Sequence, residues 1–332
     1  MRRRSFIPVS FFLLFILILA AFAQEEPTFH SQSNVVVVPA LVRDASGDAV
    51  YGLHASDFTI EDDGVEQTVH MDEEDSSTPP EPLSLIVAIQ IGRKAYHEFP
   101  RMKGLHDMLG PILEQPGAQI AIVPFDSQPG LMQDFTSDPG KIDTALKQIR
   151  GGDGGAAILD TINYCSDLLN KLPDGRRKVL LVISETRDHG SKTPIHNVVT
   201  LIGDSNITIY SLVFSPALSN ILDTERGTNT EDMNAGPDLL SPLMMAVQAM
   251  RKNAPRAVAS QTGGEYALFE SRKRFESRMI DFTNHLHSRY LLSFQPNDPH
   301  PGLHRIHVKL KQGNDATVLA RGSYWAQETA HQ

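Results

Sequence analysis

The residues that follow the most strongly apolar segment of this chain are the first place to look for chemistry. The run Leu83–Ile89 predicts a central strand of a parallel sheet that is covered on both faces. Ligands of open α/β sheets bind beyond the carboxyl ends of such strands, and here the chain has Gln90, Gly92, Arg93 and Lys94. A hard divalent cation needs several oxygen ligands, and this segment offers only the Gln90 amide.

Two further segments place polar residues where neighbouring strands would end. A glycine-rich loop at 151–155 contains Asp153, and the predicted strand 179–183 is followed by Glu185 and Asp188. The glycine-rich loop is not followed by the Lys-Ser/Thr pair of a phosphate-binding loop, and the chain has neither an H-E-x-x-H nor a G-x-S-x-G motif. We therefore predict a protein that is not an enzyme.

The elements around these residues alternate between strand and helix. This order predicts a doubly wound, mainly parallel sheet with flanking helices. The expected strands are 83–89, 119–125, 133–135, 178–183, 207–214 and 263–269, and the expected helices are 96–114, 138–150, 158–172, 195–203, 239–262 and 272–290. Residues 215–238 are polar and predict a long loop.

Both ends of the chain predict antiparallel β structure. Residues 34–72 and 291–324 contain β-branched runs and turn residues, and neither segment can easily extend a parallel sheet. We expect them to form one composite, β-sandwich-like module. An acidic, proline-rich linker at 73–82 would connect it to an α/β domain at 83–290.

The strand ends resemble the metal-ion-dependent adhesion site of von Willebrand factor type A domains. That family has D-x-S-x-S after its first strand, then a G-G-T-A-L-x-D segment, then a strand ending in S-D-G. On this resemblance, Gln90 replaces the first Asp, Gly92 and Lys94 replace the two Ser, Ala156 replaces the Thr, and Glu185 replaces the second Asp. The resemblance implies a type A domain with a degenerate metal site.

Segments outside the strand ends resemble an acidobacterial family of type A-related secreted proteins. Residues 52–64 are similar to its G-L-x-x-x-D-F-x-x-x-E-D-G motif, and residues 290–324 are similar to its Y-L-L-x-Y-x-P tail, so the resemblance covers about residues 33–324. The acids Asp57, Glu61, Asp62 and Asp63 allow a calcium loop as one interpretation. Turn formation, with Gly64 at positive φ, is the other interpretation.

Type A domains are generally interaction modules, so the resemblance implies non-enzymatic protein–protein binding. We expect no cofactor and a metal-independent surface, with Lys94 standing in for the lost cation. The alternative is a metal-dependent adhesion or envelope assembly factor that binds Mg²⁺ or Ca²⁺ through Asp153, Glu185 and Asp188. The partner would be an unidentified envelope or extracellular protein.

The chain begins with a segment that is typical of secretory signal peptides. Arg2–Arg4 precede the apolar run Phe11–Ala20, and Ala21–Ala23 form an A-x-A cleavage site. We predict cleavage after Ala23, a secreted or periplasmic protein, and no membrane insertion after cleavage; a retained anchor is the alternative. The formal charge of −10 argues against nucleic-acid binding.

Cysteine and histidine positions indicate no catalytic or metal site. Cys165, the only cysteine, lies on the apolar face of the helix predicted at 158–172, which favours a buried and inert thiol. His304 and His307 are three residues apart on a predicted strand and would face opposite sides. We therefore expect no metal site from that pair.

Overall fold

The computed structural model describes residues 35–71, 81–214, 241–297, 300–311 and 316–327, without the side chains of Arg93 and Lys94. Residues from Val35 onward group into one compact unit. The predicted signal peptide, the loop at 215–238 and most of the linker at 73–82 lie outside the described residues.

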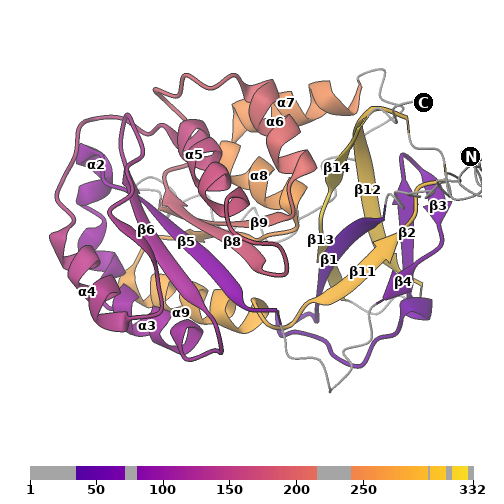
Figure 1. Ribbon diagram of the computed structural model, residues 1–332, viewed down its shortest axis with the longest axis horizontal. Coiled ribbons are helices and arrows are strands. Elements are labelled where there is room, and N and C mark those ends of the chain that lie inside the picture. Colours follow the sequence, from indigo (N-terminus) through magenta and orange to yellow (C-terminus); the bar gives the residue numbers. More distant parts are fainter. Residues whose placement is uncertain (1–34, 72–80, 215–240, 298–299, 312–315, 328–332) are drawn as a thin grey trace, which may run out of the picture. The chain divides into compact units, whose positions relative to one another are not determined.

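A six-stranded sheet forms the centre of the α/β part. Figure 1 labels its strands β5, β6, β8 and β9. Its order is β10-β9-β8-β5-β6-β7, and all neighbours are parallel except β7, which pairs antiparallel to β6 at the edge. The strands are β5 (Leu83–Gln90), β6 (Gln119–Phe125), β7 (Gln133–Thr136), β8 (Arg177–Ser184), β9 (Ile207–Phe214) and β10 (Tyr266–Phe269). This arrangement confirms the predicted fold class.

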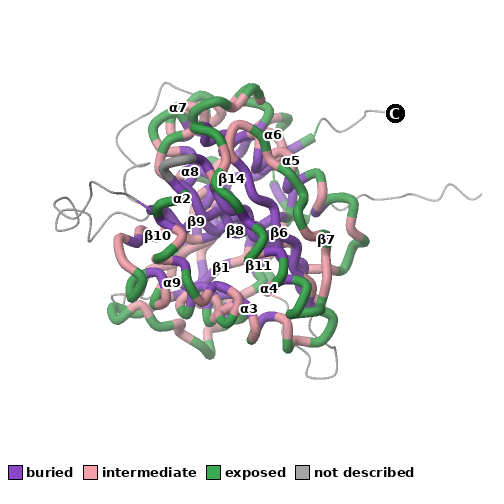
Figure 2. The backbone as a smooth tube through the Cα atoms, turned by 90° about the vertical axis from the view of Figure 1, so that its left-hand side faces the viewer, coloured by how far each residue is buried: buried purple, intermediate pink, exposed green. Residues whose placement is uncertain are grey.

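Helices cover both faces of this sheet, which explains why its strands read as continuous apolar runs. Every residue of β5 is buried, and Figure 2 shows the central strands as buried throughout. One face packs against α3 (Leu105–Leu113), α4 (Pro139–Gln148) and α9 (Arg272–His285). The other face packs against α5 (Ile158–Asn170), α6 (Ile195–Asp204), α7 (Pro242–Lys252) and α8 (Ala254–Thr262).

Three of the expected helices differ from the structure. The segment 96–114 is not one helix: it divides into α2 (Arg93–Tyr96), a 3₁₀ turn (Phe99–Met102) and α3, because Gly104 adopts a left-handed φ of 94°. The segment 239–262 divides at Asn253, whose side chain caps α8. The last helix ends at His285 rather than Tyr290, because Tyr290 begins a strand.

Two four-stranded antiparallel sheets join the ends of the chain. Their orders are β13-β1-β11-β4 and β14-β12-β2-β3. Their strands are β1 (Val36–Arg43), β2 (Phe58–Asp62), β3 (Val65–Gln67), β4 (His70–Met71), β11 (Tyr290–Phe294), β12 (Gly302–Leu310), β13 (Thr317–Ala320) and β14 (Ser323–Ala326). The N-terminal and C-terminal segments thus pair as expected, while β14 is an additional strand.

Alternation with period two gives these sheets a shared core. In β2, Phe58, Ile60 and Asp62 are buried, and β1 pairs with β11 in the register Val36↔Phe294. Residues of both chain ends meet in one apolar cluster that includes Phe294 and Val308. The domain boundaries at 72 and 290 remain a prediction, since all residues from Val35 onward group together.

Buried and partly buried charged side chains connect the antiparallel sheets to the α/β part. Arg43 of β1 donates to Glu265 at 3.1 Å, and Glu265 also contacts His285 of α9. Arg321 donates to the carbonyl oxygens of Gly203, at the end of α6, and of Ser323. Burial lowers the pKa of Arg321 to about 10.

Arg321→Ala should destabilise the folded chain. The substitution leaves buried carbonyl groups without their charged donor, and we expect a loss of about 3 kcal/mol in the free energy of unfolding, measured by urea titration. Lys309→Ala, which removes an exposed partner of Glu61, is the control and should change it by less than about 1 kcal/mol. Equal midpoints for the two variants would contradict this role for Arg321.

Candidate functional site

The carboxyl ends of β5 and β8 are joined by the side chains of Gln90 and Glu185. Gln90 is 1% exposed, and its amide nitrogen donates to Glu185 Oε1 at 2.8 Å. The amide oxygen of Gln90 accepts from the backbone N–H of Glu185 at 2.9 Å. His189 Nε2 lies 2.9 Å from the same Glu185 oxygen. The two positions where the resembling family has aspartates are therefore bound to each other.

The glycine-rich loop packs directly against the turn after β5. A Cβ atom on Gly92 would lie 2.5 Å from the carbonyl oxygen of Gly155, closer than real Cβ contacts. The backbone N–H of Gly152 donates to the carbonyl of Ile91 at 2.8 Å. The backbone at Gly155 therefore fills the space that the serine side chain of the type A motif would need at position 92.

Ala156 connects the loop before α5 to the loop after β8. It is fully buried, and its backbone exchanges two hydrogen bonds of 3.0 Å with His189. These bonds form an isolated antiparallel bridge. Backbone groups thus hold the two loops together at the position where the family has a metal-facing threonine.

The two acids that could compensate for the missing ligands serve the loops instead. Asp153 Oδ1 accepts from the backbone of Ser127 at 3.1 Å and of Gly155 at 2.7 Å. Hydrogen bonds from Ser127 and then from Gly155 lower the pKa of Asp153. Asp188 Oδ1 accepts from the N–H of Leu159 at 3.0 Å, in the first turn of α5.

Asp188 supplies the cap that α5 lacks in its own sequence. The N-cap residue of that helix, Ala157, has no side-chain acceptor. Among the described residues, Asp153, Glu185 and Asp188 do not bring three ligand atoms within 4.8 Å of one another. The side chain of Lys94, predicted to replace the cation, lies outside the described side chains.

Exposed side chains surround these packed loops. Tyr96 of α2 is 42% exposed and lies against Gly151, and Arg187 is exposed in the loop after β8. A surface hollow of about 230 Å³ lies beside this loop, with Thr186, Arg187 and Arg251 in its lining. The strand ends therefore present an aromatic ring and positive charges around an interior held by hydrogen bonds.

The remaining candidates from the sequence have structural partners. Burial raises the pKa of the Cys165 thiol, in agreement with the prediction of an inert cysteine. Asp57 accepts from the N–H of His54, and Glu61 pairs with Lys309, so these acids do not converge with their neighbours on a calcium loop. Asp63 has a φ of 47°, as expected for a turn residue.

One cluster of possible metal ligands does not emerge from the sequence pattern. Asp63, His300 and His304 place ligand atoms within 4.8 Å of one another. The spacing along the predicted strand pairs His304 with His307 only. In the structure, the neighbours of His304 are Asp63, from the turn after β2, and His300, which precedes β12. The four-residue spacing of His300 and His304 is the feature of the sequence that could have indicated this cluster.

Comparison with known proteins supports a type A-like domain. Residues 92–187 match the family model of the von Willebrand factor type A domain. No curated protein sequence matches the chain significantly. Together with the sheet topology, the family match identifies a von Willebrand factor type A-like domain in the α/β part of the chain.

The solved structures that resemble this chain do so only distantly. The chain is 14% identical to BatB from Bacteroides thetaiotaomicron, with a TM-score of 0.42 over 61% of this chain and 98% of that one. It is 15% identical to an aerotolerance-related membrane protein from Bacteroides fragilis, with the same score and coverage. These likenesses are too distant to assign a function.

Gly92→Ser, which restores a residue of the type A motif, should destabilise the protein. The new side chain would collide with the backbone of Gly155, and we expect a loss of about 1–3 kcal/mol in the free energy of unfolding. Gly154→Ser in the same loop is the matched control, because a Cβ there meets no atom within 4 Å. Thermal and urea unfolding of both variants would test this, and equal stability would contradict the packing argument.

Proposed function

We propose that this protein is a non-enzymatic protein–protein interaction module of the secreted or periplasmic compartment, and that its strand-end surface binds a partner without a metal ion. The observation that carries the proposal is the reciprocal pair of hydrogen bonds between Gln90 and Glu185. In this arrangement an amide N–H, rather than a cation, meets the need of the carboxylate for a donor.

The five motif positions support a degenerate adhesion site. Only Gln90 and Glu185 carry side-chain oxygens, and hydrogen bonds between the two residues already occupy one oxygen of each. A Mg²⁺ or Ca²⁺ ion requires six or more oxygen ligands, or water in their place. We infer that the chain belongs to the acidobacterial type A-related family, because residues 52–64 and 290–324 resemble its motifs.

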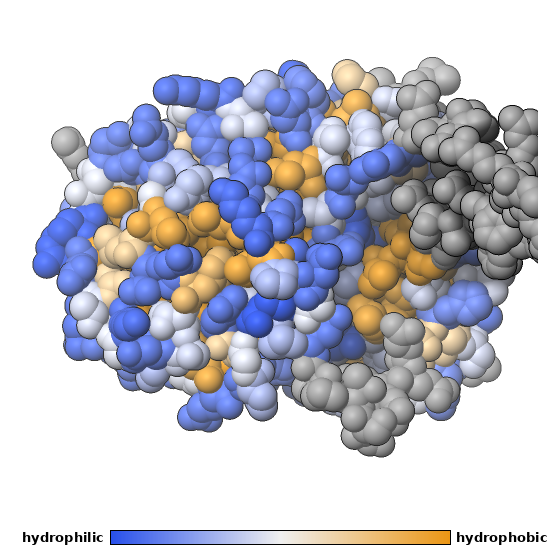
Figure 3. Space-filling model, viewed as in Figure 1, coloured by the Kyte–Doolittle hydropathy of each residue, from blue (hydrophilic) through white to orange (hydrophobic). Residues whose placement is uncertain are grey.

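The rim of the strand ends has the composition of a binding surface. Tyr96 offers an exposed ring, while Leu131 and Met132, beside β7, are each 38% exposed. Figure 3 shows hydrophobic residues bordered by hydrophilic ones over the part of the molecule where Figure 1 shows β5 and β6. Aromatic residues and arginines are enriched in the centres of protein interfaces.

Export of the chain is part of the proposal. The basic residues Arg2–Arg4, the following apolar run and the A-x-A site support it. Among the described helices, none combines the length and the apolar character that crossing a bilayer requires. Mature protein beginning at Gln24 would be the expected product.

Tyr96→Ala and Arg187→Glu should weaken partner binding. Loss of a central aromatic or arginine side chain often costs about 2 kcal/mol or more, so we expect Kd to rise at least about tenfold. The measurement is capture from envelope extract on immobilised protein, followed by titration of the captured partner. Ile280→Ala, an exposed apolar residue on the outer side of α9, should bind like the wild type.

The same assay separates the proposal from a metal-dependent adhesion or assembly factor. Binding should be equal in EDTA and in Mg²⁺ or Ca²⁺, because the loops are held by their own hydrogen bonds. Loss of binding in EDTA, together with an effect of Asp153→Asn or Asp188→Asn on Mg²⁺ titration, would establish the metal-dependent alternative instead.

A further inference from the structure

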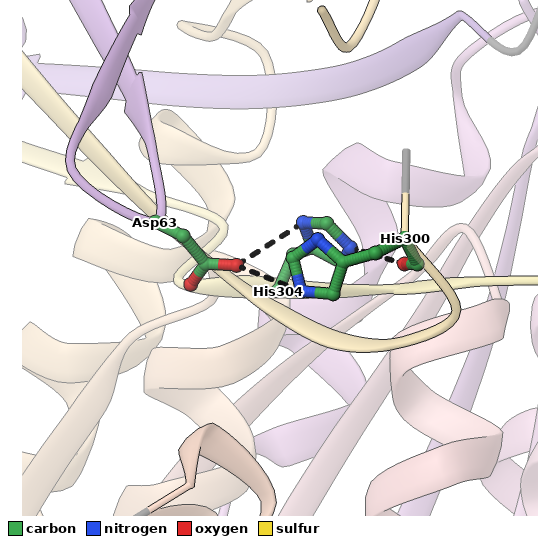
Figure 4. Close-up of side chains that lie close together, drawn as sticks. All are labelled: Asp63, His300 and His304. Carbon is green, nitrogen blue, oxygen red and sulfur yellow. Dashed lines mark hydrogen bonds and ion pairs between the residues drawn. The ribbon is translucent and has the colours of Figure 1, made fainter. Parts of the chain in front are cut away.

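Asp63, His300 and His304 converge between two segments that are far apart in the sequence. Asp63 lies in the turn between β2 and β3, His304 is in β12, and His300 precedes that strand. Figure 4 shows the three side chains pointing toward one another. Asp63 Oδ2 lies 3.2 Å from His304 Nδ1 and 3.8 Å from His300 Nε2.

The hydrogen bonds of His304 define its tautomer. Its Nε2 lies 2.6 Å from the carbonyl oxygen of His300, which can only accept, so Nε2 carries a proton. Its Nδ1 faces two carboxylate oxygens, Asp62 Oδ1 at 3.0 Å and Asp63 Oδ2 at 3.2 Å. A proton shared between Nδ1 and these carboxylates, or a metal ion bound by all of them, would satisfy this contact.

Two of the groups in this arrangement are buried. His304 is 1% exposed and Asp62 is 5% exposed. In the part of the chain that the structure describes, the ion pairs of Asp62 and Asp63 are to histidines and not to Lys or Arg. Asp63 is exposed, so the buried carboxylate here is that of Asp62, and a divalent ion at Nδ1 of His304 would offset its charge as well as that of Asp63.

We propose that Asp63, His300 and His304 form a binding site for a divalent transition-metal ion of the zinc type. Tetrahedral zinc with ligand distances of about 2.0–2.1 Å separates neighbouring ligand atoms by about 3.3 Å. Asp63 Oδ2 lies 3.2 Å from His304 Nδ1, which matches this value, and 3.8 Å from His300 Nε2, so the exposed His300 ring would need to move closer to the ion. Two imidazoles and one carboxylate favour zinc over Mg²⁺ or Ca²⁺, which prefer oxygen ligands alone.

The surroundings hold two of the three ligands in place. The backbone N–H of Asp63, which has a left-handed φ, donates to the carbonyl of Arg305 at 2.9 Å. Its Oδ1 accepts from the N–H of Arg305. These two bonds hold Asp63 in place and leave Oδ2 for the ion. The Nε2–H of His304 donates to a backbone carbonyl, as in many metal-binding histidines. The ring of Tyr324 stacks on His304 at 4.8 Å, and its hydroxyl donates to Asp62.

Three protein ligands leave a fourth position on the solvent side. The side chain of His300 is 59% exposed, whereas that of His304 is 1% exposed. Water or a ligand from another molecule would complete the coordination. The ion would also connect the turn after β2 to the start of β12, and so hold the two chain ends together.

The test is zinc binding by the tag-free chain, which is stripped of metal with EDTA, dialysed free of EDTA and then supplied with zinc. We expect one zinc per chain by elemental analysis, saturable binding in isothermal titration calorimetry and a higher Tm with zinc than with EDTA. His300→Ala and Asp63→Asn should raise Kd for zinc at least about tenfold and abolish the Tm increase. Asp63→Asn keeps the size and the tolerance of left-handed φ, so the turn should persist.

His307→Ala is the matched control, because His307 is on the same strand and its nearest carboxylate is Glu61 at 4.0 Å. It should bind zinc like the wild type. Circular dichroism in EDTA should show every variant folded. Absence of a stoichiometric zinc ion in the wild type would overturn the proposal, as would equal zinc affinity in wild type, His300→Ala and Asp63→Asn.

Discussion

A buried amide must find hydrogen-bond partners, and the strand-end loops are arranged around that requirement at Gln90. Gln90 ends β5, the strand whose eight residues are all buried between two helical layers. Its oxygen and nitrogen cannot reach bulk water. Burying an amide without hydrogen bonds costs on the order of several kcal/mol of folding free energy. Glu185 meets both needs, through its backbone N–H and its carboxylate. The ends of β5 and β8 are thereby fixed relative to each other.

The loops around this pair are held by the same kind of contact. Gly92 allows the backbone at Gly155 to approach closely, Ala156 bonds through its backbone to His189, and Asp188 caps α5. The first contact fills the space that a serine would need at position 92, and the last uses a carboxylate oxygen that a compensating metal site would need free. On the proposed function, exposed residues such as Tyr96 are the part of this surface that would contact a partner.

Long apolar patterns were enough to predict the central strands. The runs of β5, β6 and β9 were predicted within one residue, because a strand covered on both faces leaves few alternatives. The break at Gly104 was missed, because its left-handed φ depends on the packing of α2 and α3 rather than on local composition. The short strand β14 was also missed, since its partner β12 is what makes it a strand.

The candidate site likewise has some contacts that the sequence predicted and others that it did not. Strand order alone places Gln90 and Glu185 at one edge, and they do meet there. No local pattern indicates that Asp153 and Asp188 turn toward backbone N–H groups, because that depends on loop conformation. The Asp63–His304 contact joins residues that are paired only when β2 and β12 lie side by side, in the register Ile306↔Asp62. The cluster can therefore be recognised only once the fold of both chain ends is known. None of its residues belongs to the strand-end surface. Metal binding at the cluster and partner binding at the strand-end surface can thus be tested independently.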